Sequence, residues 1–248
     1  MTLERGLIIM YGIQLYSVKD FMEKGVEETL KQVAEMGYTM VEPAGYYDVS
    51  AEDFKAYCDK YGLTVSSTHN GLWTINKGNF DSTVAYLKKI GCKRFILPNC
   101  GFNTKEKLDA SIEQMNEYGP RLAAEGLELM YHNHYEEFEF NEDGLIPMVE
   151  ILNRTDIKLQ VDVYWIYRAG INPIYFLEQF KDRIGAVHLK DGNMAHGKPL
   201  GKGTAPIAQV VEWAKANNVL MVVENEPTPA KQMTEAKVCI DYLKSLKD

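Results

Sequence analysis

A repeating alternation of strand-like and helix-like segments is the feature that most constrains the fold of this chain. Runs that alternate apolar and polar side chains predict strands, and longer runs with apolar residues at i, i+4 and i+7 predict helices. Eight such pairs follow one another at about 30 residues per pair, which is the pattern of a (β/α)8 barrel. The expected strands are residues 8–15, 38–42, 63–69, 93–98, 127–132, 157–162, 184–190 and 219–224.

Capping residues, glycines and prolines predict the helix ends. Ser50 and Asn172 are expected N-caps, and Pro173 stands at a first helical position. Gly37 should end the helix before it as a C′ residue. Pro120 lies inside one expected helix and should kink or interrupt it. The expected helices are residues 23–36, 51–61, 81–90, 104–125, 144–153, one that begins at 173, 205–216 and 228–246.

The main alternative fold is a doubly wound open sheet. No Gly-x-Gly-x-x-Gly follows the first expected strand, which weakens a dinucleotide-binding version of that fold. The chain has 248 residues, a length that an α/β barrel often uses, and it contains no linker-like or low-complexity segment. We therefore expect one barrel domain over residues 1–248.

Composition and charge exclude several classes of protein. The chain is 46% hydrophobic and 25% charged, as in ordinary globular proteins. Its net charge of −8, without a long basic run, argues against nucleic acid as a partner. No segment approaches the roughly 20 apolar residues of a membrane helix. The apolar run at residues 7–10 is too short for a signal peptide, so we expect a cytoplasmic protein that does not bind membranes.

The four cysteines are expected to be free thiols. Cys58, Cys92, Cys100 and Cys239 are scattered along the chain and show no CxxC spacing. In a chain of this length such a distribution predicts neither a disulfide framework nor a zinc site.

Residues 156–191 contain the first pair of candidate metal-binding or catalytic residues that we consider. Two strand-like runs, ending near Asp162 and His188, are joined by a helix-like run. In such a βαβ unit the two strands are parallel and adjacent, so their carboxyl ends lie on the same side of the sheet. Asp162 and His188 are thus predicted to be neighbours, as metal ligands or catalytic groups. Taken singly, the Asp could instead cap a loop and the His could be a core residue.

Polar residues recur at the ends of the other strands. Barrel active sites lie at the carboxyl ends of the strands, so these positions should share one rim. Four of the five histidines, His69, His132, His134 and His188, fall at or just past strand ends. The strand-end residues are Gln14, Glu42, His69, His132, Asp162, His188 and Glu224. Because carboxylates and imidazoles are mixed here and thiolates are absent, the rim suits one divalent metal such as Mn²⁺, Mg²⁺, Co²⁺ or Zn²⁺.

Six short motifs together carry a resemblance to a known family. They are GIQLYS (12–17), YHNHYEEF (131–138), VDVYW (161–165), HLKD (188–191), GKG (201–203) and VVENE (222–226). With these motifs the chain resembles the sugar phosphate isomerase/epimerase family of xylose isomerase-like TIM barrels, and within it the subgroup with a YHNH motif. Inosose dehydratases and an abasic-site endonuclease belong to the same family.

The resemblance implies a ligand set for the metal. Many relatives hold one metal with Glu, Asp, His and Glu from strands five to eight, and Asp162, His188 and Glu224 match the last three. The first ligand is either Glu137, which follows the YHNH motif, or His132. Lys202 stands where many relatives carry a glutamate between two glycines, which implies a different substrate charge.

The resemblance also implies the reaction, which is proton transfer next to the carbonyl of a sugar or cyclitol through an enediolate. The metal would polarise the carbonyl, and side chains would remove and return the proton. The implied catalytic residues are His132, His134, Glu137, Lys190 and Glu224. The implied substrate-binding residues are Gln14, Glu42, His69, Trp165, Lys202 and Glu226. Lys190 could bind a hydroxyl, an enolate oxygen or a phosphate, or it could pair with Asp191 or Glu224.

Four functions compete at this stage. The first is a sugar isomerase or epimerase, and the second is a lyase acting on a keto-cyclitol or a 3-keto-glycoside, for which two imidazoles of the YHNH motif could serve as base and acid. An abasic-site endonuclease would need more histidines and a basic face. A non-catalytic sugar-binding barrel is disfavoured because unpaired rim carboxylates would be electrostatically costly. The expected partner is a small sugar or cyclitol, and homo-oligomer formation is left open.

Overall fold

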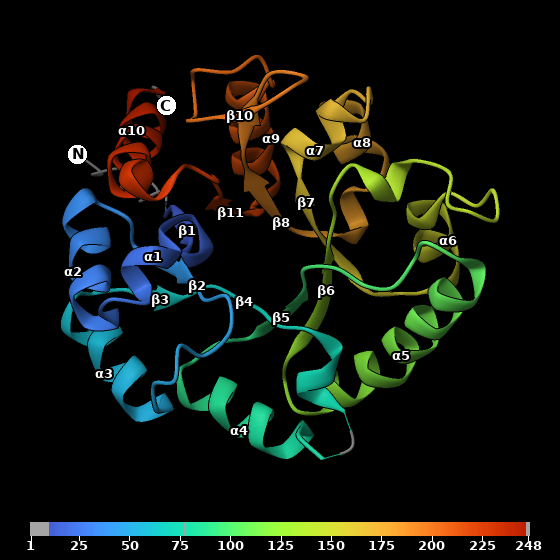
Figure 1. Cartoon of the computed structure of the whole chain (residues 1–248), viewed down its shortest axis with the longest axis horizontal. Helices are drawn as coiled ribbons and strands as arrows, with labels where there is room; N and C mark the ends of the chain where they lie inside the picture. Colours follow the sequence, from blue (N-terminus) through green and yellow to red (C-terminus); the bar gives the residue numbers. More distant parts are fainter. Residues whose placement is uncertain (1–9, 77, 247–248) are drawn as a thin grey trace, which may run out of the picture.

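A closed barrel of parallel strands, surrounded by helices, forms the centre of the molecule (Figure 1). The computed structural model describes residues 10–76 and 78–246. The barrel strands are β1 (Gly12–Gln14), β2 (Met40–Glu42), β3 (Thr64–Val65), β4 (Thr68–His69), β5 (Arg94–Leu97), β6 (Glu128–His132), β7 (Lys158–Asp162), β8 (Ile184–Leu189) and β11 (Leu220–Val223). The predicted (β/α)8 barrel is confirmed, and the open doubly wound sheet is wrong. Residues 8 and 9 of the expected first strand lie outside the described residues, so the domain limits 1–248 stay a prediction.

The barrel closes through residues 63–69, which had been expected as one strand. The sheet order is β3-β2-β1-β11-β8-β7-β6-β5-β4, and β3 and β4 are the two ends of that segment. The strand is interrupted at Ser66 and Ser67, where the Ser66 amide still donates to the Val41 carbonyl oxygen of β2 at 3.0 Å and side chains make the other contacts. The Arg94 guanidinium donates to the Ser66 carbonyl oxygen at 3.1 Å, and the Ser67 hydroxyl donates to Glu42. Beyond the interruption, the His69 amide donates to the Pro43 carbonyl oxygen at 2.8 Å.

Helices cover the outside of the barrel. They are α1 (Lys19–Met22), α2 (Val26–Met36), α3 (Ala51–Lys60), α4 (Phe80–Lys89), α5 (Lys105–Ala124), α6 (Pro147–Arg154), α7 (Val163–Arg168), α8 (Pro173–Gln179), α9 (Ile207–Asn217) and α10 (Gln232–Ser245). Short 3-10 segments are η1 (Leu15–Val18), η2 (Leu72–Ile75), η3 (Glu136–Phe138), η4 (Lys181–Arg183) and η5 (Pro229–Lys231), and β9 (Asp191–Gly192) pairs with β10 (Gly197–Lys198) outside the barrel.

Some predicted helix ends are confirmed and others are corrected. Ser50 and Asn172 cap α3 and α8 through their side chains, and Gly37 ends α2 in the left-handed region at φ 105°. The expected helix 23–36 is wrong at its start, because α2 begins at Val26, after Gly25. Of the two effects expected of Pro120, the interruption is wrong, since α5 continues through it, and the kink stays a prediction.

The interior of the barrel is divided into an apolar and a polar part. Ile96, Met130 and Ala186 form a small apolar cluster inside it, separate from the large core between strands and helices. The buried polar residues lie further along the strands toward their carboxyl ends. Within the described residues, no helix is long and apolar enough to span a membrane, and all four cysteines are free.

Candidate metal centre and active site

Four strands that are neighbours in the sheet, β6, β7, β8 and β11, bring four predicted residues together at the carboxyl end of the barrel. His132 and Asp162 are the last residues of β6 and β7. Asp162 and His188 are direct partners in the register of β7 and β8, as the βαβ pattern predicted. Glu224 follows β11, where its amide donates to the Leu189 carbonyl oxygen at 3.1 Å.

These four side chains could hold one metal ion. His132, Asp162, His188 and Glu224 each offer a ligand atom, all of these atoms lie within 4.8 Å of one another, and all four residues are buried. His132 Nδ1 and Asp162 Oδ2 are buried without a hydrogen-bond partner. Because an unpartnered buried polar atom costs free energy, such atoms indicate a missing partner. Two imidazoles and two carboxylates fit Mn²⁺, Co²⁺ or Zn²⁺ better than Mg²⁺, which prefers an all-oxygen site.

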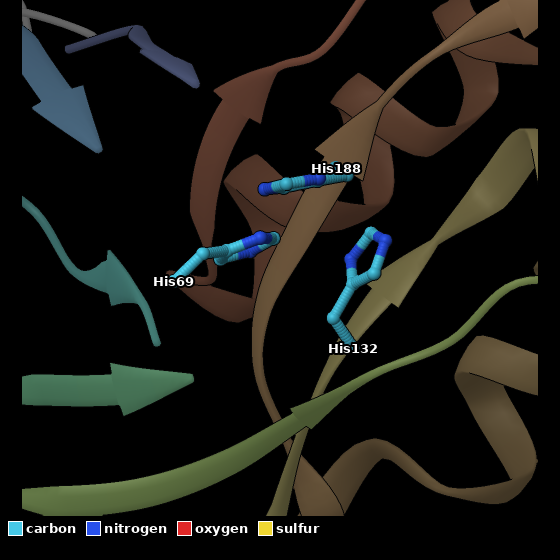
Figure 2. A group of neighbouring side chains, drawn as sticks. All are labelled: His69, His132 and His188. Carbon is cyan, nitrogen blue, oxygen red and sulfur yellow. The ribbon is translucent and has the colours of Figure 1, made fainter. Parts of the chain in front are cut away.

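His69 completes a second candidate set with His132 and His188. Figure 2 shows the three rings converging from separate strands on one space. The centroids of His69 and His188 are 5.2 Å apart in a stacked arrangement, and those of His132 and His188 are 4.7 Å apart. This set lacks a carboxylate, whereas the four-residue set contains two. The four-residue set therefore balances the charge of a divalent ion better.

Glu42 lies completely buried beside this centre. One of its oxygens accepts hydrogen bonds from Gln14 Nε2 at 2.7 Å and His188 Nε2 at 2.7 Å. The other oxygen accepts from Gln160 Nε2 at 2.6 Å and from the Ser67 hydroxyl. Burial alone would raise the pKa of Glu42, but His69 and His188 hold it well below its usual range. Glu42, in β2, therefore connects β1, β7, β8 and the segment between β3 and β4 through a single carboxylate, and it orients His188.

Two of these partners were not predicted from the sequence. Gln160 also contacts His69, with 2.7 Å between its Oε1 and His69 Nε2, and Ser67 lies in the interrupted third strand. Gln160 stands two residues before Asp162 on the same strand, so it faces the barrel interior with Asp162. This two-residue spacing, which places both side chains on the same face of the strand, is the sequence signal that could have identified Gln160.

Burial and neighbouring charges shift the pKa values of these side chains. Burial raises the pKa of Asp162 to about 7, against the effect of the Lys190 ammonium. Burial lowers the pKa of His132 well below its usual value, and the nearby His188 adds to this. His188 lies between Glu42 and Glu224, which overcome the effect of burial and raise its pKa to about 10. A cation at the centre would favour a charged Asp162 and a neutral His188.

Neighbouring groups hold Asp162 in place. Asp162 Oδ1 accepts hydrogen bonds from the amides of Tyr164 at 2.9 Å and Trp165 at 3.0 Å, so this residue also caps α7. The side-chain oxygen of Asn133 accepts from the Asp162 amide at 3.0 Å. Asn133 belongs to the YHNH motif but was not predicted to be a site residue. Its position between two predicted site histidines is the sequence signal that could have identified it.

Glu137, the other candidate for the first ligand, has different partners. Its two oxygens accept hydrogen bonds from the Tyr131 hydroxyl at 2.6 Å and the His134 amide at 2.8 Å. His134 Nδ1 lies 4.0 Å from Glu137, and its ring is 4.9 Å from the ring of His132. In this arrangement His132, and not Glu137, belongs to the four-residue set, while Glu137 holds the loop that carries His134.

Lys190, Trp165 and Glu226 form a group next to Glu224. Lys190 Nζ is buried and donates to Glu226 at 2.5 Å and to Glu224 at 3.4 Å. It also lies 4.5 Å from the centroid of the Trp165 ring. Glu224 and the other carboxylates raise the pKa of Lys190 despite its burial. Lys202, by contrast, is exposed between β10 and α9 and is not among the cavity-lining residues, so its role stays a prediction.

A cavity of about 500 Å³ opens onto the centre. Its lining includes His132, His134 and Glu224, and its mouth includes two exposed aromatic rings, Tyr16 and Trp73. The complete lining is Gln14, Tyr16, Ala44, Gly45, His69, Asn70, Gly71, Trp73, Pro98, Asn99, His132, His134, Glu224 and Glu226. A larger cavity of about 720 Å³ lies near the strand starts, between α5 and β5, β6 and β7, away from these groups.

Fold and site together define an α/β-barrel protein with a candidate divalent-metal centre at the carboxyl ends of its strands. The model of the xylose isomerase-like TIM barrel family matches residues 30–246, and the chain belongs to this family.

Solved structures and curated proteins extend this comparison. A sugar phosphate isomerase/epimerase from Parabacteroides distasonis is 26% identical, with a TM-score of 0.82 over 95% of this chain and 98% of that one. A second structure of that description from the same organism is 20% identical, with a TM-score of 0.76 over 95% and 96% of the two chains. Among curated proteins, an inosose dehydratase from Geobacillus kaustophilus is 21% identical over 89% of this chain and 87% of its own length.

Proposed function

We propose that this protein is a metal-dependent sugar isomerase or epimerase that moves a proton next to a carbonyl, through an enediolate. The observation that carries the proposal is the buried set of His132, Asp162, His188 and Glu224, with two unpartnered ligand atoms, at the base of a sugar-sized cavity. A bound divalent cation would polarise the substrate carbonyl and stabilise the negative charge that develops on its oxygen.

The remaining side chains supply positioning and proton transfer. His134 is one-third exposed and lines the cavity, so it can reach a substrate carbon as a base or acid. Glu226 is 45% exposed at its side chain and is hydrogen-bonded to Lys190, so this pair could deliver a proton on another side of the substrate. Gln14 and His69 line the same cavity and can orient hydroxyl groups.

Dehydration of a keto-cyclitol or elimination from a 3-keto-glycoside is the second candidate. It starts with the same proton abstraction but ends with loss of a hydroxyl or alkoxide, which requires an acid close to the base. If Glu137 and not His132 is the first metal ligand, His132 and His134, with rings 4.9 Å apart, fit a base and acid pair. The similarity to inosose dehydratases at 21% identity also favours it.

Three measurements test the proposal. Metal analysis of the purified protein should find about one divalent ion per chain, and a screen with ketoses, keto-sugars and inososes should reveal turnover. Deuterium from solvent should enter the carbon next to the carbonyl. Isomerisation with deuterium incorporation supports the first candidate, and release of water or an alcohol supports the lyase. Metal-loaded protein that exchanges no proton with any of these substrates would contradict both.

A further inference from the structure

The lining of the cavity over the candidate centre combines amides, imidazoles and two aromatic rings with the carboxylates of Glu224 and Glu226. Asn70 and Asn99 offer amides, and Tyr16 and Trp73 offer rings, with exposed fractions of 46% and 72% for the two aromatic residues. No lysine or arginine is among the described residues that line it. A phosphoryl group normally binds where Arg, Lys or backbone amides converge on it.

The fixed charges around the cavity favour a substrate without negative charge. With a divalent ion bound, the carboxylates of Glu42, Asp162, Glu224 and Glu226 carry four negative charges, against two on the ion and one on Lys190. Glu224 and Glu226 themselves line the cavity. A dianionic phosphate placed there would meet like charges at short range, which costs binding free energy.

Three cations that contact residues around this site, Lys190, Lys19 and Arg168, have partners of their own. Lys190 Nζ has two carboxylates and an indole ring as partners, so its charge is already neutralised. Lys19 Nζ lies 4.4 Å from the centroid of the Tyr16 ring and donates to the Tyr16 hydroxyl. Arg168 lies 4.1 Å from the centroid of the Tyr135 ring. Neither Lys19 nor Arg168 belongs to the cavity lining.

Trp73 provides the kind of surface that a neutral sugar needs. A Cβ built on Gly71 would lie 2.7 Å from indole atoms of Trp73, so the indole packs directly on the Gly71 backbone. The Trp73 carbonyl oxygen accepts a hydrogen bond from Asn79 Nδ2 at 3.2 Å, which fixes the turn. The outer face of the ring stays exposed at the cavity and can stack on the C–H face of a sugar.

We infer that the substrate is an uncharged, unphosphorylated sugar or cyclitol, bound between the neutral amides of the cavity and the Trp73 ring. This inference rests on the proposed function for the position of the substrate, but ligand binding tests it independently of turnover.

The first experiment compares matched ligands by calorimetry on protein loaded with Mn²⁺ and freed of excess metal. The pairs are D-fructose with D-fructose 6-phosphate and myo-inositol with myo-inositol 1-phosphate. The neutral member should bind at least about tenfold more tightly in each pair, a difference of about 1.4 kcal/mol. A phosphorylated member that binds as tightly would overturn the inference while leaving the proposed reaction intact. Absence of binding by every neutral ligand at millimolar concentration would also overturn it.

The second experiment changes the charge of the cavity. Glu226→Gln removes one carboxylate charge and leaves Lys190 partly free, so the preference for the neutral ligands should shrink by about tenfold. The control is Glu113→Gln on the exposed side of α5, which removes the same charge far from the cavity and should leave the preference unchanged. Equal effects of the two variants would show that net charge, and not the cavity, sets the preference.

The third variant tests the aromatic surface. Trp73→Ala should weaken the binding of the neutral ligands and leave the Mn²⁺ content unchanged.

Discussion

Asp162 has two roles that two substitutions can separate. Its Oδ2 is an unpartnered atom of the candidate metal centre, and its Oδ1 caps α7. Asp162→Asn keeps an acceptor for the cap but loses the charge, whereas Asp162→Ala loses both. We expect both variants to lose most of the metal, as measured by elemental analysis.

The same two variants should differ in stability. Loss of the helix cap costs about 1 kcal/mol, so the metal-free Asp162→Ala protein should unfold at lower denaturant concentration than metal-free Asp162→Asn. Both should retain the far-ultraviolet circular dichroism of the barrel, because the rim serves function more than stability. Full metal retention by Asp162→Ala would refute the ligand assignment.

His132 and His134 belong to one motif but should have different roles. His132 is fully buried in the four-residue set, while His134 is one-third exposed and lines the cavity. We expect His132→Ala to lose metal. His134→Ala should keep its metal and lose at least about 100-fold in kcat, the usual effect of removing a general acid or base. Elemental analysis and turnover of the same samples check this, and normal turnover in both variants would show that the motif is not catalytic.

The sequence was informative about which residues reach the site and uninformative about their partners. Strand periodicity placed Glu42, Asp162 and His188 at strand ends, and the structure brings these three together. It could not show that Glu42 accepts hydrogen bonds from Gln14, Ser67 and Gln160, because that depends on the register between distant strands. The choice between His132 and Glu137 likewise depends on the path of a loop.

The loop between β9 and α9 depends on a single buried carboxylate. Asp191 accepts hydrogen bonds from the amides of Gly192 at 2.7 Å, Gly201 at 2.9 Å, Gly203 at 3.0 Å and Ala205 at 3.2 Å. The predicted substrate residue Lys202 lies within this loop. One carboxylate thus holds three amides of residues 199–206, the part of this loop that has no helix or strand.

Asp191→Ala should therefore loosen this loop. Each hydrogen bond to a charged acceptor contributes about 1.5 kcal/mol or more, so we expect a stability loss of at least that size. Amide hydrogen exchange at residues 193–204 should accelerate more than exchange in β7 or β8. Asp182→Ala, in the surface segment η4, is a matched control and should leave the loop unchanged. Uniform acceleration over the whole barrel would argue for a general stability role instead.

Tertiary contacts override local rules at two places in the barrel. Pro120 has no amide hydrogen, yet α5 continues, with Met115 and Leu122 buried on either side of it. Packing of that face against the barrel outweighs the missing hydrogen bond. Where the third strand is interrupted, the Arg94 side chain donates to the Ser66 carbonyl oxygen, and one sequence cannot reveal such a long-range contact.

The charge of the whole molecule leads to a prediction about DNA. The chain carries a net charge of −8, and a phosphate backbone binds proteins mainly through lysine and arginine. We expect no retardation of duplex DNA at physiological salt and no nicking of DNA that contains abasic sites. Salt-sensitive micromolar binding would revive the endonuclease hypothesis despite the charge.

A metal ion at the candidate centre would link four strands of the barrel in addition to any role in catalysis. Its four residues come from β6, β7 and β8 and from the end of β11, which lie side by side in the sheet. Without a cation, the buried carboxylates of Asp162 and Glu224 repel each other, and two ligand atoms have no partner. A ligand that binds only the folded chain stabilises it by mass action, so a metal shared by four strands should stabilise the whole barrel.

Removal of the metal should therefore lower the thermal stability of the entire protein in one transition. At a free metal concentration of 100 times Kd the stabilisation is about 2.7 kcal/mol. For a chain of this size about 1 kcal/mol corresponds to roughly 2–4 °C, so a chelator should lower Tm by about 5–11 °C. Calorimetry with Mn²⁺ and with EDTA measures the shift, and Asp162→Asn should show almost none. An equal Tm under both conditions in the native chain would mean that no ion connects these strands.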